Sequence, residues 1–270
     1  MVIDGPRVPA GDQRLGVHAR TPFAGRKPTA VILAAGAGTR LRRGTDDPPK
    51  PLTELLGLTL VERAVRSCCA AGVEDFVVVV GYRRDELAPY LRTLGEDLGV
   101  RLRVAESRDW ELGNGASALA SEPYVAGEFF VIMSDHIFAP QFLDRLLESD
   151  DKPRACALVV DDDLDNIRDL PEATKVRLAN DRITAIGKQL TSFDAVDTGV
   201  FLCQPALFDA LRNAAERGRH AFGDAVQLLA AEGEVSWAPA AGLFWQDIDT
   251  PEDLDFARSH MLADGLAQIP

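Results

Sequence analysis

The chain of 270 residues is 46% hydrophobic and 26% charged, a composition that supports a sizeable core and excludes disorder throughout. Its 42 acidic residues exceed its 29 basic residues and give a net charge of -13. This charge argues against a nucleic-acid or anionic membrane partner, because such surfaces bind clustered positive charge. The four cysteines show no CxxC spacing and are interpreted as reduced thiols of a cytoplasmic protein.

Residues 1–27 contain scattered glycine and proline without apolar periodicity, which predicts a flexible extension outside the fold. They also lack the apolar core of a signal peptide. No apolar run of the sequence approaches the roughly 20 residues that span a bilayer. We therefore expect a cytoplasmic localisation, no membrane partner, and one domain formed by residues 28–270.

Strands and helices are predicted to alternate from residue 29 onward. The first apolar run ends in small residues, which is typical of a strand buried on both faces. Such alternation predicts an α/β fold: a Rossmann-like, mostly parallel sheet with helices on both faces and ligands at the strand C-termini. In chain order we expect a helix at 57–71, a strand at 76–82, a helix at 84–98, a strand at 100–105, a helix at 112–121, a strand at 128–133, a helix at 140–149 and a strand at 155–160.

The alternation breaks after an acidic loop. Strands expected at 174–179 and 182–187 flank Asn180-Asp181, a typical hairpin turn. We therefore expect a mixed sheet with a small β-hairpin subdomain at about 160–200. Further helices are expected at 205–216, at 222–232 and from 251 onward.

The segment LAAGAGTRLRRGTDDPPKPL, residues 33–52, carries the strongest indication of chemistry. Gly36 and Gly38 allow backbone N–H groups to approach an anion closely. Between residues 26 and 50, six Lys or Arg stand against two Asp, which favours a triphosphate with its magnesium ion. The segment matches neither GxGxxG nor GxxxxGK[ST], so an NAD-type dehydrogenase and a P-loop ATPase are disfavoured.

Carboxylates follow two of the apolar segments. Asp135 ends the strand FFVIM, and Asp247 and Asp249 stand two apart in another strand-end segment. Carboxylate oxygens are preferred Mg²⁺ ligands, so the three predict a magnesium site, although a single Asp in such a place is more often a helix cap. His136 is interpreted as making a local structural hydrogen bond. The scattered tryptophans are interpreted as core residues: Trp110, Trp237 and Trp245.

These motifs resemble the sugar-nucleotide pyrophosphorylase superfamily of nucleotidyltransferases, and within it the CTP:inositol-1-phosphate cytidylyltransferase family. The resemblance implies the nucleotide-diphospho-sugar transferase fold. One departure is Ser134, where glycine is expected. The matching motifs are LAAGxGTRL with PKPL, LGNGAS at 112–117, MSDH at 133–136, EATKV at 172–176, IGK at 186–188, FDAVDTGVF at 193–201 and DIDTPEDL at 247–254.

The resemblance implies Mg²⁺-dependent transfer of CMP from CTP to a small phosphorylated alcohol such as inositol 1-phosphate, with release of pyrophosphate. A phosphate monoester is largely dianionic at pH 7, so no general base and no nucleophile triad are expected. Alignment and charge neutralisation carry such a reaction. The family enzyme is often fused to a membrane-embedded transferase; here the product is expected to pass to a separate downstream transferase.

Roles for individual residues also follow from the resemblance. Arg40 and Lys50 are expected on the phosphates of the nucleotide, and Lys188 on the incoming phosphate. A small site whose backbone amides read the base would exclude purines. The nucleotide is expected on Leu33, Ala34, Ala35, Gly36, Gly38, Thr39, Gly81, Asn114, Gly115 and Ser117, and the acceptor on Glu172, Thr174, Lys175, Asp197, Thr198 and Gly199.

Several alternatives stay open. The acceptor could be a hydroxyalkyl phosphonate, phosphocholine or a sugar 1-phosphate, and UTP could replace CTP, because residues outside the shared motifs decide both. A non-catalytic nucleotide-binding regulator on the same fold is disfavoured by the presence of Arg40, Lys50, Asp135 and Asp249 together. The sequence predicts no oligomeric state.

Overall fold

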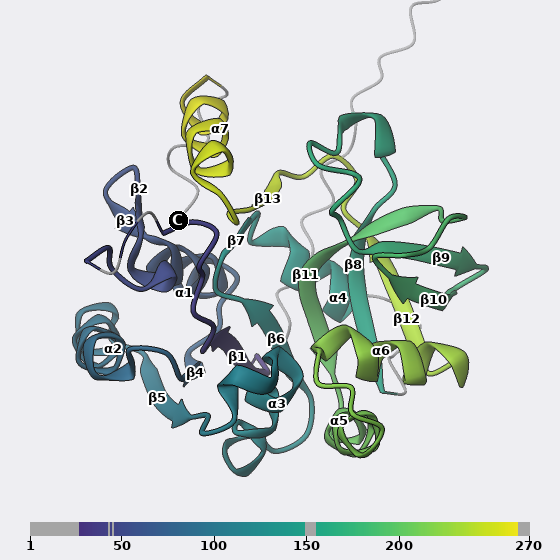
Figure 1. Cartoon of the computed structure of the whole chain (residues 1–270), viewed down its shortest axis with the longest axis horizontal. Helices are drawn as coiled ribbons and strands as arrows, with labels where there is room; N and C mark the ends of the chain where they lie inside the picture. The colour runs from purple at the N-terminus through teal and green to yellow at the C-terminus, as the bar shows by residue number, and fades with distance from the viewer. Residues whose placement is uncertain (1–26, 43, 45, 149–154, 264–270) are drawn as a thin grey trace, which may run out of the picture.

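The computed structural model describes residues 27–42, 44, 46–148 and 155–263 (Figure 1). The predicted N-terminal extension therefore lies outside the described residues, except for Lys27. None of the helices in this described part combines the length and apolar character needed to cross a bilayer.

A sheet of nine strands forms the centre of the described chain, in the order β5-β4-β1-β6-β11-β8-β12-β10-β9. Seven strands run in one direction, and β10 and β11 run against them. The expected mixed, mostly parallel sheet is thus observed. The strands are β1 (Thr29–Ala34), β4 (Asp75–Val80), β5 (Arg101–Glu106), β6 (Phe129–Met133), β8 (Cys156–Asp161), β9 (Lys175–Ala179), β10 (Arg182–Gly187), β11 (Ala195–Cys203) and β12 (Val235–Pro239).

Alternate residues of the strands pack on opposite faces of this sheet. In β1, Val31 and Leu33 join one apolar cluster, whereas Ala30, Ile32 and Ala34 join the other. Because both faces are covered, the central strands are apolar throughout rather than alternating with polar residues. The first cluster contains residues of α3 (Asn114–Leu119), α5 (Ala206–Glu216) and α6 (Phe222–Ala231), and the second contains residues of α1 (Leu60–Ala70), α2 (Arg84–Leu98) and α4 (Gln141–Glu148).

Two short two-stranded sheets flank the main one. β2 (Glu54–Leu55) pairs with β3 (Leu58–Thr59), and β7 (His136–Phe138) pairs with β13 (Trp245–Asp247). The second pairing matters for the site, because it places the segment after β6 beside the segment that leads into the last helix. That helix, α7 (Pro251–Ala263), stands apart from the sheet in Figure 1 and packs on a third small apolar cluster.

The expected hairpin is present as β9 and β10, with Asn180 in the left-handed region at φ 54°. It continues the main sheet, through β10 to β12 and through β9 to β11. The helix expected at 57–71 instead begins at Leu60, because the β2–β3 turn takes the preceding residues and Thr59 caps the helix by accepting from Glu62 N. The sequence patterns did not predict β11 and β12 as strands.

Candidate active site

The C-terminal end of β1 leads into a glycine loop, which we define as residues 35–42. Gly38 has φ 60°, and the Lys50 side chain lies directly against its Cα. A Cβ at residue 38 would overlap the Cβ of Lys50, so glycine is required here both by backbone conformation and by close approach. The loop thereby lets a lysine from the short 3-10 helix η1 (Lys50–Leu52) reach the end of the sheet.

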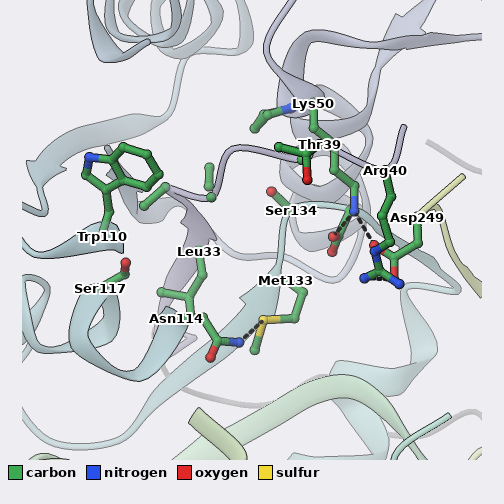
Figure 2. A pocket seen from close by; sticks show the side chains of 16 residues that line it. Leu33, Thr39, Arg40, Lys50, Trp110, Asn114, Ser117, Met133, Ser134 and Asp249 are labelled. Atoms are coloured by element: carbon green, nitrogen blue, oxygen red, sulfur yellow. Dashed lines mark hydrogen bonds and ion pairs between the residues drawn. The ribbon is translucent and has the colours of Figure 1, made fainter. Parts of the chain in front are cut away.

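Beside this loop, Lys50 is the centre of a network of charged side chains (Figure 2). Its Nζ lies 2.5 Å from Asp135 Oδ2 and 2.7 Å from Asp249 Oδ1. Arg40 Nη2 lies 2.8 Å from the second oxygen of Asp249. Four of the residues predicted from the sequence therefore meet at one point, although Asp249 is 199 positions from Lys50.

The electrostatics of the network keep Lys50 and Asp135 ionised. Burial alone would lower the pKa of Lys50, but the charges of Asp135 and Asp249 raise it. Burial alone would raise the pKa of Asp135, but Lys50 and the hydrogen bond from His136 hold it well below its usual range. At neutral pH Lys50 is therefore a cation and Asp135 an anion.

A cavity of about 300 Å³ extends from this network along the glycine loop. Trp110 and Ser117 lie at its far end from Lys50 (Figure 2). Gly81, predicted on the nucleotide, does not line it: a Cβ there would come within 2.6 Å of the Trp110 side chain. Gly81 thus acts by allowing the indole to pack. We name this space the nucleotide pocket; its lining includes Leu33, Ala34, Ala35, Gly36, Gly38, Thr39, Arg40, Lys50, Trp110, Asn114, Ser117, Met133, Ser134, Asp135 and Asp249.

Asn114 lines the pocket but uses its side chain for structure. Its Oδ1 accepts from Phe222 N at 2.8 Å, at the start of α6, and its Nδ2 points to Met133 Sδ at 3.9 Å. Gly115 is likewise pressed against this segment, with its N–H donating to His220 O at 2.9 Å. Gly115 does not line the nucleotide pocket; the predicted pair anchors one wall of it to α6.

A second, larger cavity of about 830 Å³ opens beside the first and shares Arg40, Asn114, Met133 and Asp249 with it. We name it the acceptor cavity. Residues predicted to bind the acceptor that line it are Glu172, Thr174, Asp197 and Gly199, and Lys188 and Asp247 line it as well.

His136 joins the carboxylates of the two cavities. Its Nδ1 lies 2.9 Å from Asp135 Oδ1, and its ring stacks with Trp245 at 6.5 Å between centroids. Burial would lower the pKa of His136, but Asp135, Asp247 and Asp197 raise it. Burial raises the pKa of Asp197 to about 6, since the buried carboxylate is costly to charge.

A β-bulge aims Asp197 at this cluster. The ladder between β8 and β11 shifts register between Asp197 and Phe201, and Gly199 inside it has φ 75°. The Asp197 carboxylate accepts from Gly199 N at 2.6 Å. A Cβ at residue 199 would overlap the His136 ring, so this bulge requires glycine.

Two predicted acceptor residues do not line either cavity. Lys175 is buried, and its Nζ donates to the carbonyl of Pro171. Thr198 is fully buried, and its hydroxyl donates to Val159 O at 2.8 Å. Both side chains are satisfied by backbone carbonyls and stabilise the cavity wall from behind.

The carboxylates of Asp135 and Asp249 could hold a magnesium ion together with the phosphates of a nucleotide. In the described part of the chain, no three or more Asp, Glu, His or Cys side chains gather closely enough to hold a metal. Asp135 and Asp249 do converge, on Lys50, whereas Asp247, predicted as a third ligand, lines the acceptor cavity. Mg²⁺ is commonly bound by one or two carboxylates with substrate phosphates and water completing its shell, and this pair matches that pattern.

Sequence reasoning did not select three residues that line the cavities. Trp110 and Trp245 were expected in the core, yet each lines a cavity. His136 makes the expected local hydrogen bond, to Asp135, and also lines the acceptor cavity. Arg168, also in the acceptor cavity, was not selected. The available signal was that Trp110 and Trp245 each stand two positions before a motif, LGNGAS and DIDTPEDL respectively.

Comparisons with known proteins agree with this geometry. Residues 30–232 match the family model described as MobA-like NTP transferase domain. The chain is 39% identical over 235 residues to a "Bifunctional IPC transferase and DIPP synthase" of Rubrobacter xylanophilus, and 32% identical to a protein with the same name from Aquifex aeolicus. These matches cover 86% and 87% of this chain but 52% of each relative, so the chain spans about half the length of the curated relatives it matches.

Solved structures are similar as well. The inositol-1-phosphate CTP transferase from T. maritima superposes with a TM-score of 0.78 at 32% identity, over 89% of this chain and 97% of that chain. A putative glucose-1-phosphate thymidylyltransferase from Bacillus anthracis superposes with a TM-score of 0.75 at 18% identity, over 86% of this chain and 94% of that one, which establishes likeness of fold. The expected nucleotide-diphospho-sugar transferase fold is confirmed.

Proposed function

The chain belongs to the MobA-like NTP transferase family, and from this membership we propose that it is a nucleotidyltransferase that joins CMP from CTP to inositol 1-phosphate and releases pyrophosphate. The substrates named for the similar transferase from T. maritima support this choice. The observation that carries the proposal is the network of Lys50, Arg40, Asp135 and Asp249 at the junction of a small and a larger cavity.

The reaction fits this arrangement chemically. An oxygen of the acceptor phosphate forms a bond to the α-phosphorus of CTP, and the bond from that phosphorus to the bridging oxygen breaks, so pyrophosphate leaves with the electron pair. Lys50 and Arg40 supply positive charge where negative charge builds up, which is the main requirement of phosphoryl-type transfer. The acceptor is already an anion, so no residue has to remove a proton.

Asp135 and Asp249 are the residues that would hold Mg²⁺. A magnesium ion bound there would neutralise charge on the triphosphate and on the leaving pyrophosphate. Mg²⁺ would compete with Lys50 for the two carboxylates, and an ammonium group displaced from them would be available to the nucleotide. These four side chains would therefore let the site hold an anion and a cation together.

The acceptor cavity supports a polar, phosphorylated acceptor. Lys188 stands 3.8 Å from Glu172 there and offers a cation to the acceptor phosphate. Asp197 and Glu172 can accept hydrogen bonds from hydroxyl groups of a polyol. We propose that the product, a CDP-alcohol, is consumed by a downstream transferase reaction, and that the product is formed in the cytoplasm.

The test is a grid of pyrophosphate-release assays with Mg²⁺. CTP, UTP, ATP and GTP are each combined with inositol 1-phosphate, glucose 1-phosphate, phosphocholine and 2-hydroxyethylphosphonate. Release that requires CTP and inositol 1-phosphate is the expected result. Release with CTP and a different acceptor would replace the acceptor and keep the reaction type.

Silence across the whole grid would overturn the proposal. If the folded protein still bound CTP, for example by calorimetry, the result would favour a nucleotide-binding regulator on the same fold. Arg212→Met serves as the control for substitutions of charged residues in the site. Arg212 pairs with Glu122 and Asp209 on the protein surface and lines neither cavity.

A further inference from the structure

The acceptor cavity has two walls that are far apart in the sequence. One wall is the segment that connects β8 to β9, which we name the acceptor loop (residues 161–174). It contains the short 3-10 helix η4 (Leu164–Asn166). The facing wall is formed by β13 and the first turns of α7. Residues of both segments line the same space.

Within the acceptor loop, hydrogen bonds connect near neighbours. Asp163 N donates to Asp161 Oδ1 at 3.1 Å, and Glu172 N donates to Asp169 O at 3.1 Å. The C-terminal end of the loop is also tied to the sheet, because Asp197 N donates to Thr174 O at 2.9 Å and Lys175 Nζ donates to the carbonyl of Pro171. The middle of the loop reaches another element through a side chain, that of Arg168.

Two such side-chain connections cross the cavity to the facing wall. Trp245 Nε1 donates to Asp161 Oδ2 at 2.7 Å, at the start of the loop. In the middle of the loop, Arg168 Nη1 donates to Asp253 Oδ1. The same guanidinium stands 4.8 Å from the centroid of the Phe256 ring. Arg168 thus contacts α7 through both charge and an aromatic face.

Asp253 uses its two oxygens for different partners. Oδ1 receives Arg168, while Oδ2 accepts from Asp249 N at 3.1 Å, Thr250 N at 2.8 Å and Thr250 Oγ1 at 2.8 Å. The second set of bonds caps the N-terminus of α7, with Thr250 and Asp253 bonded to each other. The carboxylate is only 13% exposed, so both sets act on one well-held group.

The contact of Arg168 therefore continues to the phosphate end of the site. Asp253 holds the backbone of Asp249, and the Asp249 carboxylate contacts Lys50 at 2.7 Å and Arg40 at 2.8 Å. Asp253 therefore links Arg168 of the acceptor loop to Asp249, the residue proposed to hold the metal.

Resting on the proposed function, we infer that Arg168 is a positioning residue, which holds the acceptor loop against the start of α7 so that the acceptor cavity and the Asp249 carboxylate form as one unit. Acceptor binding then depends on Arg168 although Arg168 need not touch the reacting atoms. Arginine is suited to this task because its planar guanidinium can bind a carboxylate while it stacks on an aromatic ring, whereas a lysine ammonium forms a single point contact.

The test combines two measurements on the full chain with Arg168→Met, Arg168→Lys and the surface control Arg212→Met. Hydrogen–deuterium exchange reports the backbone of residues 161–174 and of residues 249–254 without any substrate. Steady-state kinetics give KM for CTP and for the acceptor separately. For Arg168→Met we expect faster exchange in both segments and an acceptor KM that rises roughly 10- to 100-fold, a larger increase than that of the KM for CTP.

Arg168→Lys is expected to restore part of the acceptor affinity, and Arg212→Met to match the parent protein in both measurements. Unchanged exchange at 249–254, or equal increases in both KM values, would overturn the inference. If Arg168→Met does not fold, Asp253→Asn gives the same test, because its amide oxygen can still cap α7 while the ion pair is lost. If the parent protein does not use inositol 1-phosphate, the exchange data still decide the inference, since they need no substrate.

Discussion

The two cavities differ in size and in how the chain builds them. The nucleotide pocket measures about 300 Å³, and most of its lining comes from one continuous stretch, residues 33–51. The acceptor cavity measures about 830 Å³ and collects its lining from Arg40, Asn114 and segments spread between residues 133 and 260; it shares Arg40, Asn114, Met133 and Asp249 with the nucleotide pocket. Residues of one continuous loop can bind a triphosphate. Recognition of a particular alcohol depends instead on how segments that are distant in the sequence pack together.

Asp135 lines the nucleotide pocket and is hydrogen-bonded to His136, which lines the acceptor cavity, so its replacement should damage both. Asp135→Asn keeps the shape of the side chain but removes the charge that pairs with Lys50 at 2.5 Å. We expect turnover to fall by about 10³-fold, because charge stabilisation at the phosphates is lost. Single-turnover pyrophosphate release measures the effect, and the melting temperature provides the control for folding. Near-normal turnover would remove Asp135 from the chemistry.

Lys50 separates the behaviour of the metal from that of the nucleotide. In Lys50→Met we expect turnover to fall by about 10²-fold, whereas Mn²⁺ should bind the nucleotide-free protein more tightly than it binds the parent. The reason is that Asp135 and Asp249 lose the ammonium group that now lies between them. Paramagnetic titration with Mn²⁺ measures this binding. The double variant Lys50→Met/Asp249→Asn should lose this gain in Mn²⁺ affinity. Equal Mn²⁺ affinities in the parent and in Lys50→Met would contradict competition between Lys50 and the metal for the two carboxylates.

Trp110 tests whether the nucleotide pocket is independent of the acceptor cavity. Stacking of a base on an aromatic side chain contributes about 1–3 kcal/mol, so Trp110→Ala should raise the KM for CTP by about 10-fold and leave that for the acceptor unchanged. Trp237→Ala is the matched control, because Trp237 lines neither cavity and bonds to Asn180 O. A rise in the acceptor KM of Trp110→Ala would show that the two spaces are coupled through this residue.

Asp197 should produce the smallest effect, on stability. Its pKa is raised by burial from 3.8 to about 6, so the folded protein binds its proton more tightly than the unfolded chain does. The resulting stability is fully present below about pH 4 and is lost as the pH rises through about 6, with a change of roughly 1–3 kcal/mol. Denaturant unfolding of the parent and Asp197→Asn at several pH values measures it. The variant should lack this decline; parallel curves for the two proteins would refute the assignment.

Local patterns were sufficient for several elements of the N-terminal half of the sheet. The apolar run of β1, the glycine loop and α2 are each encoded by neighbouring residues, and β1 and α2 were predicted close to their observed positions. Asp135 and Asp249 were selected from the sequence because Asp135 follows the apolar strand FFVIM and Asp249 stands in another strand-end segment.

The acceptor cavity could not be predicted to the same depth. Trp245 meets Asp161 across 84 positions, and Arg168 meets Asp253 across 85 positions, so no local pattern identifies either pair. The antiparallel course of β11 between β6 and β8 is also a property of the whole sheet. Conversely, Lys175 and Thr198 have the chemistry of binding residues, but nearby carbonyl groups take up their hydrogen bonds.

The bond from Phe222 N to Asn114 has a genetic consequence. Asn114 borders both cavities, and its side chain holds the first residue of α6. A substitution of Asn114 that changed the nucleotide pocket would also remove the bond that holds the start of α6, which lines the acceptor cavity. Such a mutation would therefore be pleiotropic. Descendants of this enzyme that acquire a new nucleotide should therefore do so through other codons, or only alongside compensating mutations in α6.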